Sequence, residues 1–349
     1  MYPALAVHSA LTSKIPDADT LWVGGEAGME EALVKRQGIA FQSIPAAGVH
    51  GVGLALMPRN LLLLGRGIIA AHRILREFDP DVLFFTGGYV AVPMALAARG
   101  RSIPILLYVP DIEPGIALKS LAGFSDVITV TTDESQKYFN KPVLVTGYPL
   151  RADLPLWNRQ TAHRHLGITA ELPVLLVFGG SKGARSINMA VLHHLRALLE
   201  KFEIIHLSGE PDWAAVKGER ERLPVELAAR YHALPYLHEM GAALAAADLV
   251  VSRAGASCLG EFPLFGLPAV LVPYPHAWRY QKVNSDYLAR RGAAVVLQDH
   301  RLEDELLVTL GILLDNPNKL KAMRASMFEL SHPRAADKIA SALIRLSGD

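Results

Sequence analysis

Short apolar runs alternate with longer amphipathic segments along most of the chain. The apolar runs that predict strands lie at residues 20–25, 41–44, 81–85, 104–108, 127–130, 143–146, 173–178, 204–207, 231–234, 249–251 and 269–272. The segments that predict helices begin at residue 1 and lie at residues 30–37, 60–77, 93–99, 187 onward, 240–247 and 302–346. This alternation is typical of parallel α/β sheets. It predicts an α/β protein of two doubly wound, Rossmann-like domains that face each other across a cleft.

The expected domain boundary lies near residue 150, because residues 148–159 are polar, contain proline and suit a linker. We expect one domain at residues 1–150 and a second at 151–331. The last helix, at residues 332–349, is expected to pack back toward the first domain.

The beginning of the chain is unusual for a parallel sheet. Residues 1–7 read as the opening of a helix, with Pro3 in its first turn. Such a sheet normally begins with a strand whose C-terminal loop feeds the first helix. We therefore expect either a fold without that strand or a protein whose true start lies upstream of Met1.

Composition narrows the function classes. The 349 residues are 51% hydrophobic, which allows a large core, and no run of about 20 apolar residues suits a membrane span. A net charge of +1 argues against nucleic-acid binding as the main role. The single cysteine, Cys258, excludes an internal disulfide and a cysteine-based zinc site.

Residues 249–281 carry the strongest candidate chemistry. An apolar strand runs into a small-residue turn at residues 252–257, a helix containing Glu261, a second strand and a polar loop containing Gln281. Free backbone N–H groups at a helix start suit a phosphate. A carboxylate about one and a half turns into the helix is placed to accept hydrogen bonds from sugar hydroxyls. The same spacing also fits an ordinary βαβ unit with a surface glutamate.

Four motifs go beyond a generic α/β pattern: FFTGGYV at residues 84–90, VTGYPLR at 145–151, FGGSKGAR at 178–185, and the 249–281 block. In order and spacing, over nearly the whole chain, they resemble glycosyltransferase family 28. The family contains the bacterial transferases that add N-acetylglucosamine to undecaprenyl-pyrophosphoryl-muramoyl-pentapeptide. The resemblance implies the GT-B fold, with the lipid acceptor on the N-terminal domain and UDP-N-acetylglucosamine (UDP-GlcNAc) on the C-terminal domain.

The resemblance also implies a set of binding residues. In the nucleotide-sugar site, Ser181 would contact the phosphates, Arg151 the uracil, Glu261 the ribose hydroxyls and Gln281 the sugar hydroxyls. The implied nucleotide-sugar residues are together Arg151, Ser181, Gly183, Tyr236, Leu237, Gly255, Ala256, Ser257, Glu261 and Gln281. On the acceptor side the implied residues are Gly87, Gly88 and Tyr89. Taken singly, each residue also fits an ordinary surface or linker role.

The chain departs from the family pattern at the proposed catalytic positions. The family has a glycine-rich loop ending in histidine directly before the residues that match Tyr2 and those after it. His8 is no substitute, because it lies about two turns into the helix. Where the family has His-Glu-Gln-Asn, residues 108–111 read Tyr-Val-Pro-Asp. Asp111 and Glu113 are the catalytic candidates that remain, and both also fit acids of a turn.

A further departure concerns the sugar. The family pairs two glutamines where this chain has Tyr280 and Gln281. The implied reaction is a single inverting displacement, with UDP-GlcNAc as co-substrate and no other cofactor. No Asp-x-Asp lies near a strand end, so we expect no obligatory metal.

A membrane contact is expected because the implied acceptor is a polyprenyl lipid. Residues 49–74 mix apolar side chains with Arg59, Arg66 and Arg73, a composition that suits an anionic membrane surface. The same helix also fits packing on the sheet, with its arginines in water. We expect a peripheral protein on the cytoplasmic face of the bacterial inner membrane.

Three other functions stay open on sequence grounds. One is a GT-B transferase that acts on a different lipid or small molecule. Another is a UDP-sugar-binding protein that is catalytically impaired because the N-terminal loop is missing. The third, a nicotinamide-dependent dehydrogenase, is disfavoured because no G-x-G-x-x-G motif follows a strand with an acid about 20 residues on.

Overall fold

The computed structural model describes residues 1–26, 30–46, 57–169, 171–276 and 279–348. It divides the chain into two compact units. Unit 1 comprises Met1–Arg151 and Arg334–Asp349, and unit 2 comprises Ala152–Pro333. The first part of the expected membrane patch, at residues 49–56, lies outside the described residues.

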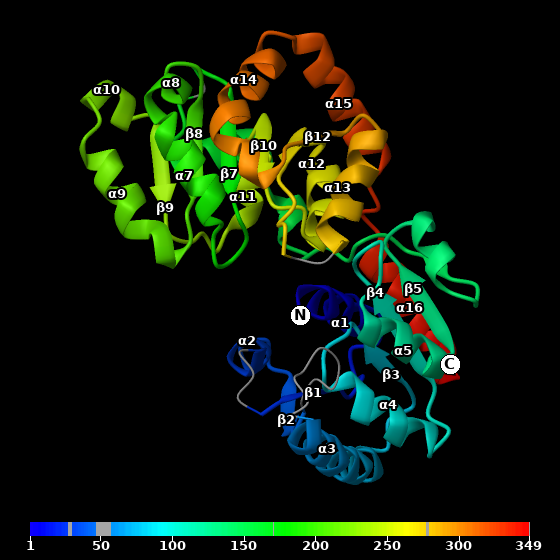
Figure 1. The fold of residues 1–349 in the computed structure, drawn as a ribbon. Helices are drawn as coiled ribbons and strands as arrows, with labels where there is room; N and C mark the ends of the chain where they lie inside the picture. The colour runs from blue at the N-terminus through cyan, green and yellow to red at the C-terminus, as the bar shows by residue number, and fades with distance from the viewer. Residues whose placement is uncertain (27–29, 47–56, 170, 277–278, 349) are drawn as a thin grey trace. The chain divides into compact units, whose positions relative to one another are not determined.

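Unit 1 is a parallel α/β structure (Figure 1). Its elements are α1 (Tyr2–Lys14), β1 (Leu21–Gly25), α2 (Glu30–Arg36), β2 (Ala40–Ile44), α3 (Met57–Phe78), β3 (Leu83–Phe85), α4 (Ala91–Arg99), β4 (Ile105–Val109), α5 (Ile116–Phe124), β5 (Val127–Val130), η1 (Asp133–Tyr138), β6 (Leu144–Val145) and α16 (Ala335–Ser347). Over the described residues the strands form two parallel sheets, β1-β2 and β3-β4-β5-β6.

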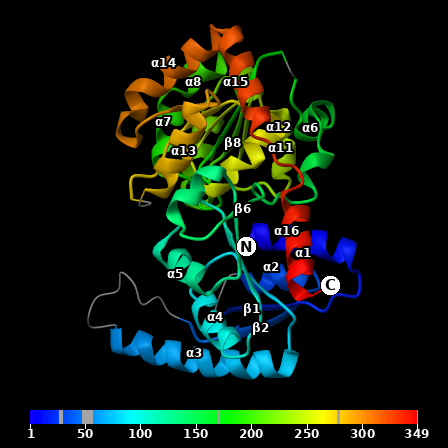
Figure 2. The same ribbon diagram turned by 90° about the vertical axis from the view of Figure 1, so that its right-hand side faces the viewer.

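Strand β4 shows how unit 1 buries both faces of its larger sheet. Ile105, Leu107 and Val109 point into a core shared with α3, α4 and α5. Leu106 and Tyr108, at the alternate positions, pack against α1 and α16. Figure 2 shows α1 and α16 side by side. The C-terminal helix is therefore part of the core of unit 1.

Unit 2 contains the residues between the two parts of unit 1. Its elements are η2 (Leu154–Leu156), α6 (Arg159–Leu166), β7 (Val174–Phe178), α7 (Arg185–His193), α8 (Leu195–Leu199), β8 (Glu203–Leu207), η3 (Glu210–Asp212), α9 (Trp213–Glu221), α10 (Val225–Ala228), β9 (Tyr231–Leu234), α11 (Met240–Ala246), β10 (Leu249–Ser252), η4 (Ala256–Leu259), α12 (Glu261–Phe265), β11 (Ala269–Leu271), α13 (Tyr280–Arg290), β12 (Ala294–Val296), η5 (Asp299–Arg301), α14 (Leu302–Leu314) and α15 (Pro317–Glu329).

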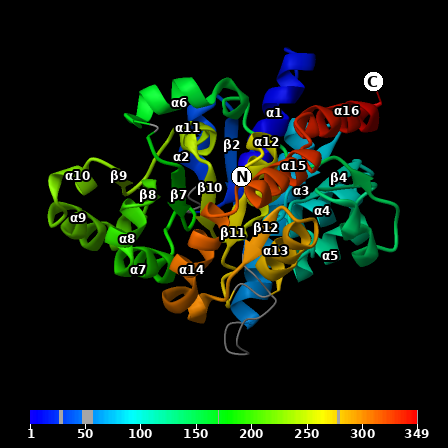
Figure 3. The ribbon, with the colours of Figure 1, turned by 90° about the horizontal axis from the view of Figure 1, so that it is seen from above.

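The strands of unit 2 form one parallel sheet over the described residues, in the order β12-β11-β10-β7-β8-β9 (Figure 3). Helices α7, α8 and α14 cover one face, where Leu175 and Val177 of β7 lie in their core. The chain moves outward from β7 in one direction through β8 and β9, and in the other through β10, β11 and β12. The strand order therefore reverses between β7 and β10, which is the doubly wound arrangement.

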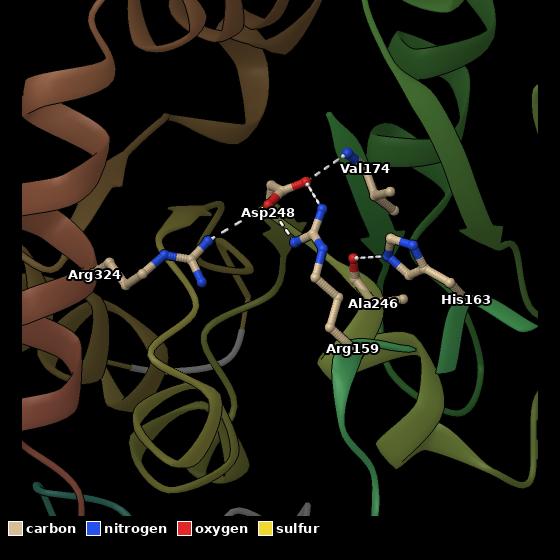
Figure 4. A network of polar contacts seen from close by, with 6 residues as sticks. All are labelled: Arg159, His163, Val174, Ala246, Asp248 and Arg324. Carbon is tan, nitrogen blue, oxygen red and sulfur yellow. Dashed lines mark hydrogen bonds and ion pairs between the residues drawn. The ribbon is translucent and has the colours of Figure 1, made fainter. Parts of the chain in front are cut away.

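A carboxylate at the amino end of β10 ties several elements of unit 2 together (Figure 4). Asp248 accepts two hydrogen bonds from the Arg159 guanidinium, at 2.6 and 2.8 Å, and one from the backbone N–H of Val174 at 3.0 Å. The guanidinium of Arg324 lies 3.6 Å from the same carboxylate. Burial alone would raise the pKa of Asp248, but these bonds and charges hold that pKa below its usual range.

Local sequence fixes the helix that presents Arg159. The side chain of Asn158 accepts a hydrogen bond from the backbone N–H of Thr161, and Thr161 bonds back to the backbone N–H of Asn158. This capping box starts α6 at Arg159. Gly167, at a φ of +70°, ends the helix in the left-handed conformation that glycine favours.

The predicted α/β class and the two parallel-sheet domains are confirmed. Several elements had no prediction: the helix α5 in unit 1, and in unit 2 the helices α6, α9, α10 and α13 and the short strand β12. The polar loop expected to hold Tyr280 and Gln281 is wrong for these two residues, since both lie in the first turn of α13.

Candidate functional site

The point where the strand order of unit 2 reverses is the candidate site. Residues 179–184 leave the carboxyl end of β7, and residues 253–255 leave the carboxyl end of the neighbouring strand β10. In doubly wound sheets, ligands bind in the crevice between two such loops. The structure thus brings the predicted residues Ser181 and Gly183 to the same sheet edge as Gly255, Ala256 and Ser257.

The loop after β7 contains several glycines, and Gly183 is the one packed against the turn after β8. Gly183 has a φ of +74°, and a Cβ there would lie 2.0 Å from the carbonyl oxygen of Ser208. Its N–H donates to the carbonyl of Gly180 at 2.9 Å. Ser181 stands exposed between them. Helix α7 begins directly afterwards, and the N–H groups of its first turn have no partners within the helix. This loop and helix start suit a phosphate.

The segment after β10 does not form the single continuous helix that was expected there. Gly255 is followed by the 3-10 turn η4, and Gly260 separates that turn from α12. Glu261 is therefore the first residue of α12, and its expected place one and a half turns into a continuous helix is wrong. The side chain of Glu261 is half-buried at this position. Glu261 still follows the turn at residues 255–257 closely in the sequence.

Arg253 carried no predicted role, although it links the loop after β10 to the first turn of α7. Its guanidinium is nearly buried and donates to the carboxylate of Asp299 at 2.5 Å and to the hydroxyl of Ser186 at 2.8 Å. Ser186 also donates to Asp299 at 2.7 Å. Because Ser186 lies in the first turn of α7, this triangle holds the loop after β10 against the helix that follows the glycine loop.

Gln281 is oriented by the loop after β11. Its side-chain oxygen accepts a hydrogen bond from the backbone N–H of Tyr274 at 2.8 Å, so the amide nitrogen points away from that loop. Asn284, one turn further along α13, donates to the carbonyl of Ala254 at 3.1 Å. Helix α13 therefore holds Gln281 beside the loop that carries Gly255. An amide oriented in this way can donate to an oxygen of a ligand.

Tyr236 and Leu237 follow the carboxyl end of β9, at the same sheet edge. Tyr236 is exposed and packs edge-on against the ring of His238 at 4.9 Å. The preceding residue, Pro235, accepts a hydrogen bond from the backbone N–H of Gly209 at 3.0 Å. This bond ties the segment to the turn after β8. Arg151 belongs to unit 1, where its guanidinium lies over the ring of Tyr2 at 5.4 Å.

The predicted acceptor-side and catalytic residues lie at the carboxyl edge of the larger sheet of unit 1. Gly87 and Gly88 follow β3, both with positive φ, and Tyr89 beside them is exposed. Asp111 and Glu113 follow the neighbouring strand β4. Asp111 is half-buried, whereas Glu113 is 8% exposed. The two loops are neighbours because their strands pair in parallel.

The segment that carries Asp111 is held from below by strand β5. The hydroxyl of Thr131 lies 2.7 Å from the carbonyl oxygen of Pro110 and 2.7 Å from the hydroxyl of Tyr108. Tyr108 is fully buried, and this burial raises the pKa of its hydroxyl. Within the residues that the structure describes, no group of histidine, cysteine, aspartate and glutamate side chains could hold a metal ion.

Comparison with known proteins identifies the family. The model of the glycosyltransferase family 28 N-terminal domain matches residues 1–129, and that of its C-terminal domain matches residues 174–339. A protein from Roseiflexus sp. (strain RS-1) is 39% identical over 97% of this chain and 91% of its own length. The chain belongs to glycosyltransferase family 28. The resemblance seen in the motifs is therefore confirmed.

A second curated relative and a solved structure are also similar to this family 28 chain over nearly its whole length. A protein from Desulforudis audaxviator (strain MP104C) is 38% identical over 100% of the chain and 95% of its own length. Both relatives are named UDP-N-acetylglucosamine–N-acetylmuramyl-(pentapeptide) pyrophosphoryl-undecaprenol N-acetylglucosamine transferase. The crystal structure of MurG from Acinetobacter baumannii matches with a TM-score of 0.79 and 27% identity, over 99% of this chain and 95% of that one.

Proposed function

We propose that this family 28 chain transfers N-acetylglucosamine from UDP-GlcNAc to undecaprenyl-pyrophosphoryl-muramoyl-pentapeptide, in peptidoglycan synthesis. The observation that carries the proposal is the full-length identity of 39% with a relative named for this transfer. The strand reversal of unit 2 supports it, because a glycine loop that suits a phosphate, the carboxylate of Glu261 and the amide of Gln281 all follow the carboxyl ends of strands in one sheet.

Each part of the nucleotide sugar has a proposed partner in unit 2. The glycine loop with Ser181, and the start of α7, would hold the diphosphate. Glu261 would accept hydrogen bonds from the ribose hydroxyls, and Gln281 would donate to an oxygen of the sugar. Tyr236 and Leu237 would lie against the base.

The reaction is a displacement at the anomeric carbon of the sugar. The acceptor hydroxyl attacks this carbon and loses its proton to a base, while the bond to the diphosphate breaks and UDP leaves. The charge that grows on the diphosphate is stabilised by the N–H groups at the start of α7 and by Ser181. Asp111 is our candidate for the base, because its half-buried carboxylate stands at a sheet edge beside the glycines of the acceptor side.

Helix α3 is the proposed membrane contact. Gly67, Ala71, Ile74 and Leu75 form its buried face, so the helix does pack within unit 1. The opposite side exposes Leu62 and Ile69, at 66% and 73%. On the same side the exposed residues Arg59, Arg66 and Arg73 repeat every seven residues and form a row beside Leu62 and Ile69. Adjacent apolar and cationic rows suit the surface of an anionic bilayer.

This arrangement makes the protein peripheral to the membrane in our proposal. Among the described residues, no helix is both long and apolar enough to span a bilayer. The lipid acceptor would be reached from the bilayer surface, on the cytoplasmic side of the inner membrane, where UDP-sugars are found.

The activity is tested with the full chain, radiolabelled UDP-GlcNAc and the lipid-linked muramoyl-pentapeptide in detergent micelles. Formation of labelled lipid together with release of UDP is the expected result. UDP release that requires a different acceptor would instead identify another transferase. Binding of UDP-GlcNAc with no release under any acceptor would indicate a binding protein and refute the proposal.

The membrane contact is tested by flotation with vesicles that contain phosphatidylglycerol, at low salt. Replacing Leu62 and Ile69 with asparagine should weaken binding by roughly tenfold, because two apolar side chains no longer enter the bilayer. The matched control replaces Val308 and Ile312 on α14 of unit 2, which are exposed to a similar degree. Equal binding of all three proteins would exclude α3 as the contact.

A further inference from the structure

A chain of buried polar groups lies behind the glycine loop of unit 2. The Tyr231 hydroxyl lies 2.7 Å from Nδ1 of His206, and Nε2 of His206 lies 3.0 Å from the side-chain oxygen of Asn188. All three side chains are fully buried. They come from β9, β8 and α7, so the chain of contacts crosses from the edge strand to the helix that follows the loop.

Asn188 passes this chain on to two groups near the loop. Its amide nitrogen donates to the carbonyl oxygen of Ser208 at 2.8 Å and to the carboxylate of Asp212 at 2.8 Å. The Ser208 oxygen is the atom against which Gly183 packs. Asp212 in turn accepts a hydrogen bond from Arg185, the first residue of α7, at 2.7 Å. Both hydrogen bonds of the Asn188 amide nitrogen therefore lead to the segment that would hold the diphosphate.

The directions of these hydrogen bonds are fixed by chemistry. Both hydrogens of the Asn188 amide go to oxygens that can only accept, so its side-chain oxygen must accept from His206. Nε2 of His206 then carries the proton, and Nδ1 accepts from the hydroxyl of Tyr231. Burial lowers the pKa of His206 to about 4, which keeps the ring neutral in this form. Each member has one role, and none can be reversed alone.

We infer that His206 and Tyr231 are positioning residues of the diphosphate site: they fix the amide of Asn188, which holds the Ser208 turn and Asp212 in place beneath the glycine loop. This inference deepens the proposed function and rests on it. Both side chains are fully buried, so neither would touch the nucleotide sugar. Their effect on the reaction passes through the placement of the glycine loop and of the α7 start.

The consequence is a selective effect on the nucleotide sugar. If the amide of Asn188 loses its partner, it can rotate, and the Ser208 carbonyl then loses its hydrogen bond. The glycine loop rests directly on that carbonyl, so its N–H groups would no longer be held in one arrangement for the phosphates. Binding of UDP-GlcNAc should weaken, whereas contacts to the lipid acceptor should stay as they are.

The test compares variants of the full chain. His206→Met removes the hydrogen-bond donor to Asn188, whereas His206→Gln retains an amide nitrogen in about the same place. Tyr231→Phe removes only the hydroxyl and guards against a His206 variant that does not fold. The control is His163→Met. His163 is also buried in unit 2, and its Nε2 bonds to the carbonyl of Ala246, near the amino end of β10 and away from the glycine loop (Figure 4).

The measurements are the KM for UDP-GlcNAc, the KM for the lipid acceptor, kcat, and the thermal midpoint of each variant. We expect His206→Met to raise the KM for UDP-GlcNAc roughly tenfold, with the acceptor KM within twofold of wild type. Tyr231→Phe should raise the KM for UDP-GlcNAc roughly threefold, and His206→Gln should keep that KM much closer to wild type than His206→Met does. His163→Met should lower the thermal midpoint and leave both KM values unchanged.

Two outcomes would overturn the inference: unchanged UDP-GlcNAc KM values in folded His206→Met and Tyr231→Phe proteins, or an equal rise in the His163→Met control. Hydrogen exchange of the amides of residues 179–184 separates this failure from failure of the proposed function. Wild type that neither binds nor releases UDP refutes the function. Faster exchange in His206→Met, but not in His163→Met, would still support the positioning role, and equal exchange would refute it.

Discussion

Replacing Gly183 with alanine perturbs the candidate diphosphate site at one atom. The backbone there has a φ of +74°, and the new Cβ would lie 2.0 Å from the carbonyl oxygen of Ser208. Ordinary contact begins at 3.4 Å, so the loop and the Ser208 turn must separate by about 1 Å or more. The turn is held by Asn188 from behind, and we therefore expect the loop to move.

The expected loss of affinity follows from that movement. The left-handed conformation costs alanine roughly 1 kcal/mol, which lowers stability without moving any atom. A loop shifted by about 1 Å would lose one or two hydrogen bonds to the charged diphosphate, each worth roughly 1.5–3 kcal/mol. The Kd for UDP should then rise by roughly 10- to 100-fold.

Gly180 provides the matched control for this substitution. It also has a positive φ, of +96°, but a Cβ there would meet no atom within 4 Å. Gly180→Ala therefore carries the backbone strain without the collision. We would measure UDP affinity by isothermal titration calorimetry and stability by thermal unfolding for both variants. Affinities that agree within twofold, in two folded proteins, would refute the reasoning.

Three further changes test other parts of the molecule. Asp248→Asn should lower the free energy of unfolding by roughly 2 kcal/mol at pH 7, because it leaves Arg159 without its carboxylate. The pKa of Asp248 is lower in the folded than in the unfolded state, so its carboxylate stabilises the fold above the unfolded pKa of about 3.9 and loses this effect as the pH falls through the folded pKa. In urea titrations, the difference in unfolding free energy between wild type and variant should therefore be smaller at pH 3 than at pH 7. Glu261→Gln should raise the Kd for UDP roughly tenfold in calorimetry, with little change for a 2′,3′-dideoxy analogue; equal losses for both ligands would exclude a ribose contact. Asp111→Asn should lower kcat at least roughly 100-fold in the UDP-release assay, and a rate within twofold of wild type would remove it from the mechanism.

The sheet-edge loops could be predicted from the sequence because their signals are local. An apolar run followed by glycines and hydroxyl residues marks the carboxyl end of a strand, and this predicted that Ser181 and Gly255 each follow a strand end. The order of the strands was not in the pattern itself. It became certain only through the pairing of β7 with β10 in the structure.

Helix starts without caps were harder to predict. Helix α13 begins after Arg279 with no side chain capping its first turn, so nothing in the sequence separated Tyr280 and Gln281 from the preceding loop. Gly260 breaks the segment between Ala256 and Phe265 into a 3-10 turn and a short helix. A glycine inside a helical pattern does not reveal by itself whether it interrupts the helix.

Contacts between distant residues could not be predicted at all. Arg253 and Asp299 are 46 positions apart, and Asn188 meets Asp212 24 positions away. Periodicity shows which side of an element is buried, but it does not show which buried polar groups will meet. His206 is a polar residue between the apolar Ile205 and Leu207, a position that indicates a buried hydrogen-bond partner but does not show which residue it is.

The place of α16 in unit 1 bears on how the protein is made. A nascent chain emerges from the ribosome N-terminus first, and domains generally fold as they emerge. Unit 2 is one continuous segment and can fold before the C-terminal helix is synthesised, but in unit 1 only α1 can cover Leu106 and Tyr108 until residues 335–347 arrive. The first half of the protein to be synthesised is thus the last to be completed, and until then part of its apolar sheet face is open to chaperones.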